Sequence, residues 1–193
     1  MKPVSTDRES QDREIWRRFR YHSRTFSLAA LFLPRRIRMP VAILYLFCRS
    51  VDEIADSVVL EHGQQEALAR LDGVRDHLDA TIRGRPPSAT LWTRLLEVNE
   101  EFPLNEAPMH ELIEGARWDL EGRGIENEQD LVRYSDLVGG SIGAMMLPLL
   151  GLRGDESVEA RARDMGIGMQ ISNIVRDVGE DLRVLKRSYL PRT

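Results

Sequence analysis

The sequence has a single cysteine, no cluster of histidines and no excess of positive over negative charge. Each of these absences argues against a class of protein. The only cysteine, Cys48, excludes an internal disulfide and fits a reducing compartment. The histidines are scattered and lack the spacing of a zinc site. A formal net charge of −4, with no motif typical of a nucleic-acid reader, argues against a nucleic-acid partner.

Long apolar runs and strand-like patterns are also missing. The longest apolar run, residues 142–152, is too short to span a bilayer and contains Pro148. Residues 1–14 are polar and charged, unlike a secretory signal. No stretch alternates apolar and polar residues for long enough to form a strand, and no glycine-rich dinucleotide fingerprint occurs. We therefore expect a cytoplasmic protein that is peripheral to a membrane at most.

What the sequence does contain is helical periodicity. With 193 residues, 42% of them apolar and 30% charged, the chain fits one globular domain, residues 16–193, after a polar segment, residues 1–15. Ser88 and Asn105 are predicted N-caps. Pro40 suits a first helical turn. The predicted helices cover about residues 40–59, 67–82, 89–101, 106–121, 129–150 and 155–187. The predicted fold class is mainly α.

Two of these helices carry an acidic stripe beside an apolar face. At about 100° per residue, Asp52 and Asp56 share one stripe with Tyr45 and Arg49. The stripe on the last predicted helix consists of Gln170, Asn173, Asp177 and Asp181. A polar stripe that borders a buried face suits the lining of a cavity.

Carboxylates in such rows are typical ligands of Mg²⁺, which proteins often hold with few side chains while substrate phosphates complete its coordination. Facing rows could clamp ions around a diphosphate and promote its departure. Arg49 and Arg176 lie beside the aspartates and could contact phosphate oxygens. Spacing alone is weak support, because Asp72 and Asp76 have the same spacing without amide or aromatic companions. We interpret that pair as surface.

With their flanks, these residues resemble the squalene/phytoene synthase family. The resemblance runs from about Trp16 onward. Its blocks are YHSRTF (21–26), LYLFCRSVDEIADS (44–57), the stretch from Trp118-Asp119 through Tyr134 to LVGGSIG (137–143), and MQISNIVRDVGEDL (169–182) with YLP (189–191). The resemblance implies a single isoprenoid-synthase helical bundle around an apolar cavity, with both aspartate-rich helices facing each other at its mouth.

The resemblance also implies roles for residues. The implied ligands of Mg²⁺, or of Mn²⁺ in its place, are Asp52, Asp56, Asn173, Asp177 and Asp181. The implied diphosphate contacts are Ser23, Arg49, Tyr134, Gln170, Asn173 and Arg176. Tyr45 is a candidate to stabilise a carbocation through its π face, as are Phe26 and Phe47, although the two phenylalanines fit an ordinary core equally well.

The implied activity is a prenyltransferase reaction that joins two prenyl diphosphates head to head through a cyclopropylcarbinyl diphosphate. Proton loss then yields phytoene or dehydrosqualene, whereas hydride from NADPH yields squalene. The small residues Ala29, Ala30 and Ala42 favour a longer tail. We therefore expect a phytoene synthase of carotenoid biosynthesis using two geranylgeranyl diphosphates. The alternative is a squalene or dehydrosqualene synthase using farnesyl diphosphate, and NADPH is expected only for squalene.

Other interpretations remain open. Asn173, Asp177 and Asp181 also have the spacing used by terpene cyclases, although HSRTF and LVGGSIG argue against one. Family members continue beyond YLP into further helices. We therefore expect this chain to lack C-terminal helices and to be poorly stable or inactive alone, which also allows a non-catalytic accessory protein. The oligomeric state stays open.

The basic segments Trp16–Arg24 and Leu33–Arg38 stand out in an acidic protein. They could attract diphosphates or contact an anionic membrane. Ordinary surface arginines explain them equally well.

Overall fold

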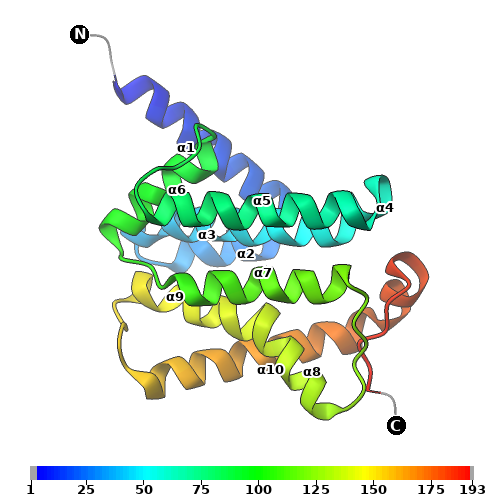
Figure 1. Cartoon of the computed structure of the whole chain (residues 1–193). Coiled ribbons are helices and arrows are strands. Elements are labelled where there is room, and N and C mark those ends of the chain that lie inside the picture. Colours follow the sequence, from blue (N-terminus) through cyan, green and yellow to red (C-terminus); the bar gives the residue numbers. More distant parts are fainter. Residues whose placement is uncertain (1–3, 192–193) are drawn as a thin grey trace. The chain divides into compact units, whose positions relative to one another are not determined.

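The computed structural model describes residues 4–191, with side chains from Arg8 onward, and this part of the chain is helical without any strand (Figure 1). The predicted mainly α fold class is thereby confirmed. Contacts divide the chain into two compact units, each built from separate stretches. Within the described residues, unit 1 comprises residues 4–50 and 77–104, and unit 2 comprises residues 51–76 and 105–191. No helix among residues 4–191 is long and apolar enough to cross a membrane.

Unit 1 is a group of helices around an aromatic core. It contains α1 (Val4–His22), α2 (Arg24–Ala29), the short 3₁₀ turn η1 (Ala30–Phe32), most of α3 (Arg35–Glu53), the end of α5 (Gln64–Ile82) and α6 (Thr90–Glu101). Phe47 is fully buried and its ring lies 6.1 Å from that of Trp92. Asp12 Oδ1 of α1 lies 2.7 Å from Nη2 of the buried Arg94 of α6, which ties these two helices together. Since α1 runs through residue 15, part of the segment that we expected to be merely polar is helical.

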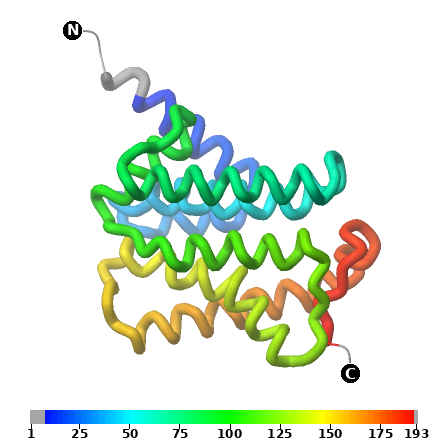
Figure 2. Tube along the Cα trace, in the orientation of Figure 1, coloured from blue at the N-terminus to red at the C-terminus, as the bar shows by residue number. Residues whose placement is uncertain are grey.

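Unit 2 contains the π-helix η2 (Ile54–Val58), α4 (Val59–His62), the first part of α5, and α7 (Glu106–Leu120). After α7 come α8 (Glu128–Ser135), the π-helix η3 (Asp136–Gly140), α9 (Ser141–Leu150), α10 (Glu156–Glu180) and the π-helix η4 (Asp181–Leu185). α8, η3 and α9 form one continuous path, and α10 packs along it (Figures 1 and 2). α7 packs against η3 and α9.

Local capping signals explain several helix ends. Asn105 caps α7, as predicted, because its Oδ1 accepts a hydrogen bond from Ala107 N at 3.1 Å. Gly151 ends α9 with φ 72°, a conformation that glycine adopts without strain. The prediction for Ser88 is wrong, because α6 starts one residue later and its N-cap is Ala89. Pro40 lies inside α3 rather than in its first turn, because α3 already begins at Arg35.

The apolar face predicted for the last helix is only partly covered. Its residues are Ile171, Ile174, Val175, Val178, Leu182 and Leu185. Ile174 is buried and three others are half-buried, whereas Val175 is 65% exposed and Leu182 is also exposed. The expectation of a buried face is therefore met only in part within the described part of the chain. It assumed that every apolar stripe has a neighbouring element to cover it, which periodicity alone cannot guarantee.

Glycines allow η3 and α9 to touch the backbone of α10. A Cβ on Gly139 would lie 2.5 Å from Gly166 O, and Cβ atoms on Gly143 or Gly166 would also collide with backbone atoms of the facing helix. From the sequence, the glycines of LVGGSIG fit either close packing or a helix break, and the family resemblance favours the break. The path is continuous and closely packed instead, with the π-helix η3 in place of a break.

Candidate functional site

The second aspartate of each acidic motif lies in a π-helix. Asp52 is near the end of α3 and Asp56 is in η2, while Asp177 is in α10 and Asp181 is the first residue of η4. All four side chains are half-buried. A π-turn closes i→i+5 hydrogen bonds and is wider than an α-turn, so the uniform α-helical rotation behind the predicted stripes does not hold at these points. π-turns of this kind are frequent at functional sites.

Carboxylates of the two motifs lie close enough to affect each other. Burial raises the pKa of Asp181, and the negative charges of Asp177 and Asp56 raise it further. Asp177 behaves differently because Arg176 Nε and Nη2 donate to its two carboxylate oxygens at 2.8 and 2.6 Å. This pairing lowers the pKa of Asp177. The motifs, distant in sequence, therefore meet within unit 2.

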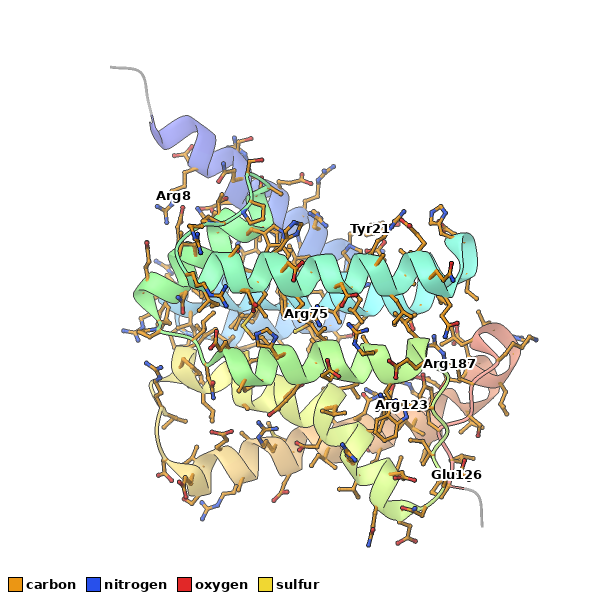
Figure 3. The ribbon with its side chains drawn as sticks, viewed as in Figure 1. Arg8, Tyr21, Arg75, Arg123, Glu126 and Arg187 are labelled. Carbon is orange, nitrogen blue, oxygen red and sulfur yellow. The ribbon has the colours of Figure 1, made fainter. Side chains whose placement is uncertain are left out.

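Arg187 lies between the first motif and α7. Its Nη2 donates to Ala55 O at 2.8 Å, and its Nη1 lies 3.6 Å from Asp56 Oδ1 and 3.9 Å from Asp119 Oδ2. Figure 3 shows Arg187 beside the C-terminal end of α7. Nη1 is buried and has no hydrogen-bond partner among the described residues. This guanidinium nitrogen is therefore held by the charges of two carboxylates rather than by a short hydrogen bond.

A buried carboxylate, Asp119, organises the region behind Arg187. Tyr134 and Tyr189 donate from their hydroxyls to Asp119 Oδ2 and Oδ1, each at 2.9 Å. The two tyrosine rings stack with centroids 5.0 Å apart. Burial raises the pKa of Asp119 to about 6, although Arg187 and the two hydroxyls oppose the shift. We call Asp119, Tyr134, Arg187 and Tyr189 the Asp119 cluster.

The raised pKa of Asp119 predicts a pH-dependent stability. Folded protein binds the Asp119 proton more tightly than unfolded protein, so this contribution is fully present below about pH 4 and is lost as the pH rises through about 6. The shift from 3.8 to about 6 corresponds to roughly 3 kcal/mol. We expect the unfolding free energy of the wild type to fall by up to this amount, relative to Asp119→Asn, between pH 4 and pH 7.5. Urea unfolding of both proteins measures it, and parallel pH profiles would contradict the assignment.

The remaining predicted site residues have ordinary structural partners or are half-buried. In unit 1, Ser23 Oγ caps α2 by accepting from Phe26 N at 3.1 Å, and the Tyr45 ring lies 4.7 Å from that of Phe19. Arg49 is half-buried, and its Nε has no hydrogen-bond partner among the described residues. In unit 2, Gln170 and Asn173 are half-buried on α10. No three His, Cys, Asp or Glu side chains form a ready metal cage in the part of the chain described.

A sequence model of the squalene/phytoene synthase family matches residues 19–193. The chain belongs to this family. It is 41% identical over 175 residues to the phytoene synthase of Cereibacter sphaeroides, covering 88% of this chain and 48% of that protein. It is 36% identical over 172 residues to the 15-cis-phytoene synthase of a Paracoccus species, covering 88% and 56%. The chain thus spans about half the length of the curated relatives it matches.

Solved structures of squalene/phytoene synthase relatives have the same fold. A dehydrosqualene synthase superimposes with a TM-score of 0.81 at 29% identity, covering 96% of this chain and 62% of that one. The squalene synthase HpnC from Alicyclobacillus acidocaldarius gives a TM-score of 0.83 at 28% identity, covering 94% and 66%. The expected isoprenoid-synthase bundle is therefore confirmed as the fold of this squalene/phytoene synthase chain.

Three members of the Asp119 cluster have no role predicted from the sequence, namely Asp119, Arg187 and Tyr189. A signal existed for two of them, since Trp118-Asp119 and the YLP block belong to the stretches that resemble the squalene/phytoene synthase family. Arg187 offered no such signal among so many arginines. Only its position beside Asp56 and Asp119 distinguishes it.

Proposed function

We propose that this chain acts in the Mg²⁺-dependent, head-to-head condensation of two geranylgeranyl diphosphates to phytoene. The observation that carries the proposal is the meeting of the two aspartate-rich motifs in unit 2 beside a buried arginine. Support for the product comes from relatives named phytoene synthase at 36–41% identity.

The donor set fits a hard divalent cation. The repulsion of Asp181 by Asp177 and Asp56 would be relieved by a cation bound beside them, and carboxylate oxygens suit Mg²⁺, or Mn²⁺ in its place. Asp52 and Asn173 complete the proposed ligands. The few protein donors are consistent with a site that substrate phosphates complete. A cation bound there would offset negative charge on the departing diphosphate.

The chain's own residues would bind and orient the diphosphate. Arg187 places a positive charge next to Asp56, with its Nη1 3.6 Å from Asp56 Oδ1. Tyr134 points its hydroxyl at Asp119, and burial together with the charge of Asp119 keeps its pKa well above the ordinary value. It therefore stays protonated. The other proposed diphosphate contacts are Ser23, Arg49, Gln170, Asn173 and Arg176. Tyr45 is the proposed cation-stabilising ring.

Condensation of two farnesyl diphosphates is the alternative within the family. It is favoured by the solved neighbours, which are named dehydrosqualene and squalene synthases. Their identity to this chain is lower than that of the phytoene synthases, so we place this alternative second. A requirement for NADPH would belong only to squalene formation.

A product assay tests the proposal. Purified protein with Mg²⁺ receives geranylgeranyl or farnesyl diphosphate, with and without NADPH, and the extracts are analysed by mass spectrometry. We expect a C40 hydrocarbon from geranylgeranyl diphosphate that EDTA abolishes. A C30 product from farnesyl diphosphate alone would support the alternative. Absence of both a hydrocarbon and Mg²⁺-dependent diphosphate binding would overturn the proposal.

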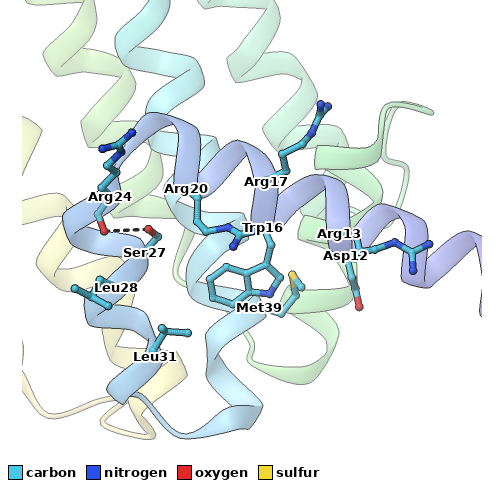
Figure 4. A pocket seen from close by; sticks show the side chains of 10 residues that line it. All are labelled: Asp12, Arg13, Trp16, Arg17, Arg20, Arg24, Ser27, Leu28, Leu31 and Met39. Carbon is cyan, nitrogen blue, oxygen red and sulfur yellow. Dashed lines mark hydrogen bonds between the residues drawn. The ribbon is translucent and has the colours of Figure 1, made fainter.

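We also propose that unit 1 contacts an anionic lipid surface. α1, α2, η1 and α3 line a groove of about 1040 Å³ in which arginines lie beside apolar side chains (Figure 4). Its apolar lining includes Trp16, Leu28, Leu31 and Met39, and its arginines are Arg13, Arg17, Arg20 and Arg24. Of these arginines only Arg17 has an ion-pair partner among the described residues. Nearby Tyr21 and Phe32 are each 86% exposed, and exposed aromatics beside arginines suit a headgroup layer.

Vesicle binding tests this contact. Each arginine near an anionic surface contributes about 1 kcal/mol. Replacing Arg13, Arg20 and Arg24 by glutamine should therefore weaken co-sedimentation with phosphatidylserine vesicles by roughly a hundredfold. Arg153→Gln, an exposed change in unit 2, is the control and should have no effect. Equal binding to phosphatidylcholine vesicles would contradict the electrostatic contact.

A further inference from the structure

Burying the charged carboxylate of Asp119 costs hydration free energy. It lies at the end of α7 between the buried side chains of Trp118 and Leu120, and its own side chain is only 10% exposed. A carboxylate loses favourable hydration there, and its partners must replace that hydration. Two tyrosine hydroxyls and a guanidinium do so only in part, because the pKa stays raised. Stability alone therefore gives little reason for an aspartate at this position.

Two of the three contacts of Asp119, those with Arg187 and Tyr189, involve the segment that follows η4. After Lys186, whose φ is 57°, the chain turns and brings Arg187 and Tyr189 back towards α7. Tyr189 hydrogen-bonds Asp119 Oδ1, and Arg187 lies on the Oδ2 side, where Tyr134 also donates. Asp119 thus fastens this segment at two points, one through charge and one through a hydrogen bond.

The position of Arg187 depends on more than one negative group. Its Nη1 lies between Asp56 and Asp119, at 3.6 and 3.9 Å from their oxygens, and its side chain is 15% exposed. If metal ions and a diphosphate bind at Asp56, the negative charge of Asp56 is shared with them and its ion pair with Arg187 weakens. The charge of Asp119 remains, and the Ala55 carbonyl still accepts from Nη2. Asp119 can therefore hold the guanidinium in place throughout binding.

We propose that Asp119 is a positioning residue that fixes the guanidinium of Arg187 beside the first acidic motif, where the diphosphate is proposed to bind. This inference deepens the proposed function and rests on it for the identity of the ligand. Tyr189 assists by anchoring the same segment, and Tyr134 orients the carboxylate. Asp119 itself does not touch the reacting groups.

Limited proteolysis tests the positioning without any activity. Trypsin cleaves after arginine once the side chain is bound in its specificity pocket. A guanidinium held by Asp119 must first leave its site, so cleavage after Arg187 should be slow. We expect Asp119→Asn to speed release of the peptide that begins at Ser188 by about tenfold, as follows from losing roughly 1.4 kcal/mol of restraint. Asp72→Asn is the matched control, because Asp72 Oδ1 pairs with Arg117 Nη2 at 2.7 Å in the same unit. It should leave this cleavage unchanged, and thermal melts at the same pH identify any global unfolding.

Calorimetry with Mg²⁺ and inorganic diphosphate supplies the second measurement. Asp119→Asn and Arg187→Ala should each weaken binding about tenfold, and the double variant should be no weaker than Arg187→Ala, because Asp119 acts through Arg187. Additive losses, or unchanged cleavage after Arg187 in Asp119→Asn, would overturn the inference. Wild-type protein that fails to bind diphosphate would instead refute the proposed function, while the cleavage rates would still decide the role of Asp119.

Discussion

Replacing Asp177 with asparagine is expected to lower hydrocarbon formation by about a thousandfold, an effect of the size found when a group that stabilises developing charge is removed. Asparagine keeps the shape of the side chain but loses the charge that a divalent cation requires. It also frees Arg176, which now pairs with both Asp177 oxygens. The measurement is the rate of C40 product formation at saturating Mg²⁺.

The chain contains its own control for this change. Asp76 follows Asp72 with the spacing of the acidic motifs, but its side chain is 74% exposed and pairs weakly with Arg75, at 3.9 Å. Asp76→Asn should alter the rate by less than about twofold, as expected for a surface charge. If Asp177→Asn changed stability but left turnover untouched, the non-catalytic accessory protein would become the better interpretation.

Gly166→Ala and Gly168→Ala are expected to change stability in opposite directions, although the residues lie two positions apart on α10. A Cβ on Gly166 would meet the carbonyl group of Gly139 and lie 2.9 Å from Gly140 N. These are backbone atoms, which cannot rotate away, so α10 must move from η3. We expect a loss of about 3 kcal/mol in unfolding free energy, at the upper end for overpacking.

Gly168 provides the matched control. A Cβ there meets no described atom within 4 Å, and alanine is a better helix former than glycine. Gly168→Ala should therefore stabilise the protein by about 0.5–1 kcal/mol. Urea unfolding of the two variants and the wild type measures both effects. Stabilisation by both changes would show that η3 and α10 are not in backbone contact at Gly166.

Features that depend on neighbouring residues could be predicted from the amino-acid sequence. Apolar periodicity predicted the mainly α class and the helix end at residue 150, and Asn105 predicted the start of α7, because each signal acts over one or two helical turns. The order of the motifs gave the family. Asp52, Asp56, Asp177 and Asp181 stood out without coordinates, since their types and spacing suffice to propose a cation site.

How these parts meet depends on the packing of the folded chain. The π-turns at Asp56 and Asp181 change the angle between successive side chains along the helices. The change from i→i+4 to i→i+5 hydrogen bonds that produces them cannot be predicted from the spacing of apolar residues. The apolar stripe around Val175 predicted a buried face but could not supply a neighbour to cover it. Asp119 and Arg187 became site candidates only once the fold placed them together beside Asp56. Burial and charge pairing between residues distant in the chain depend on packing, which local sequence does not encode.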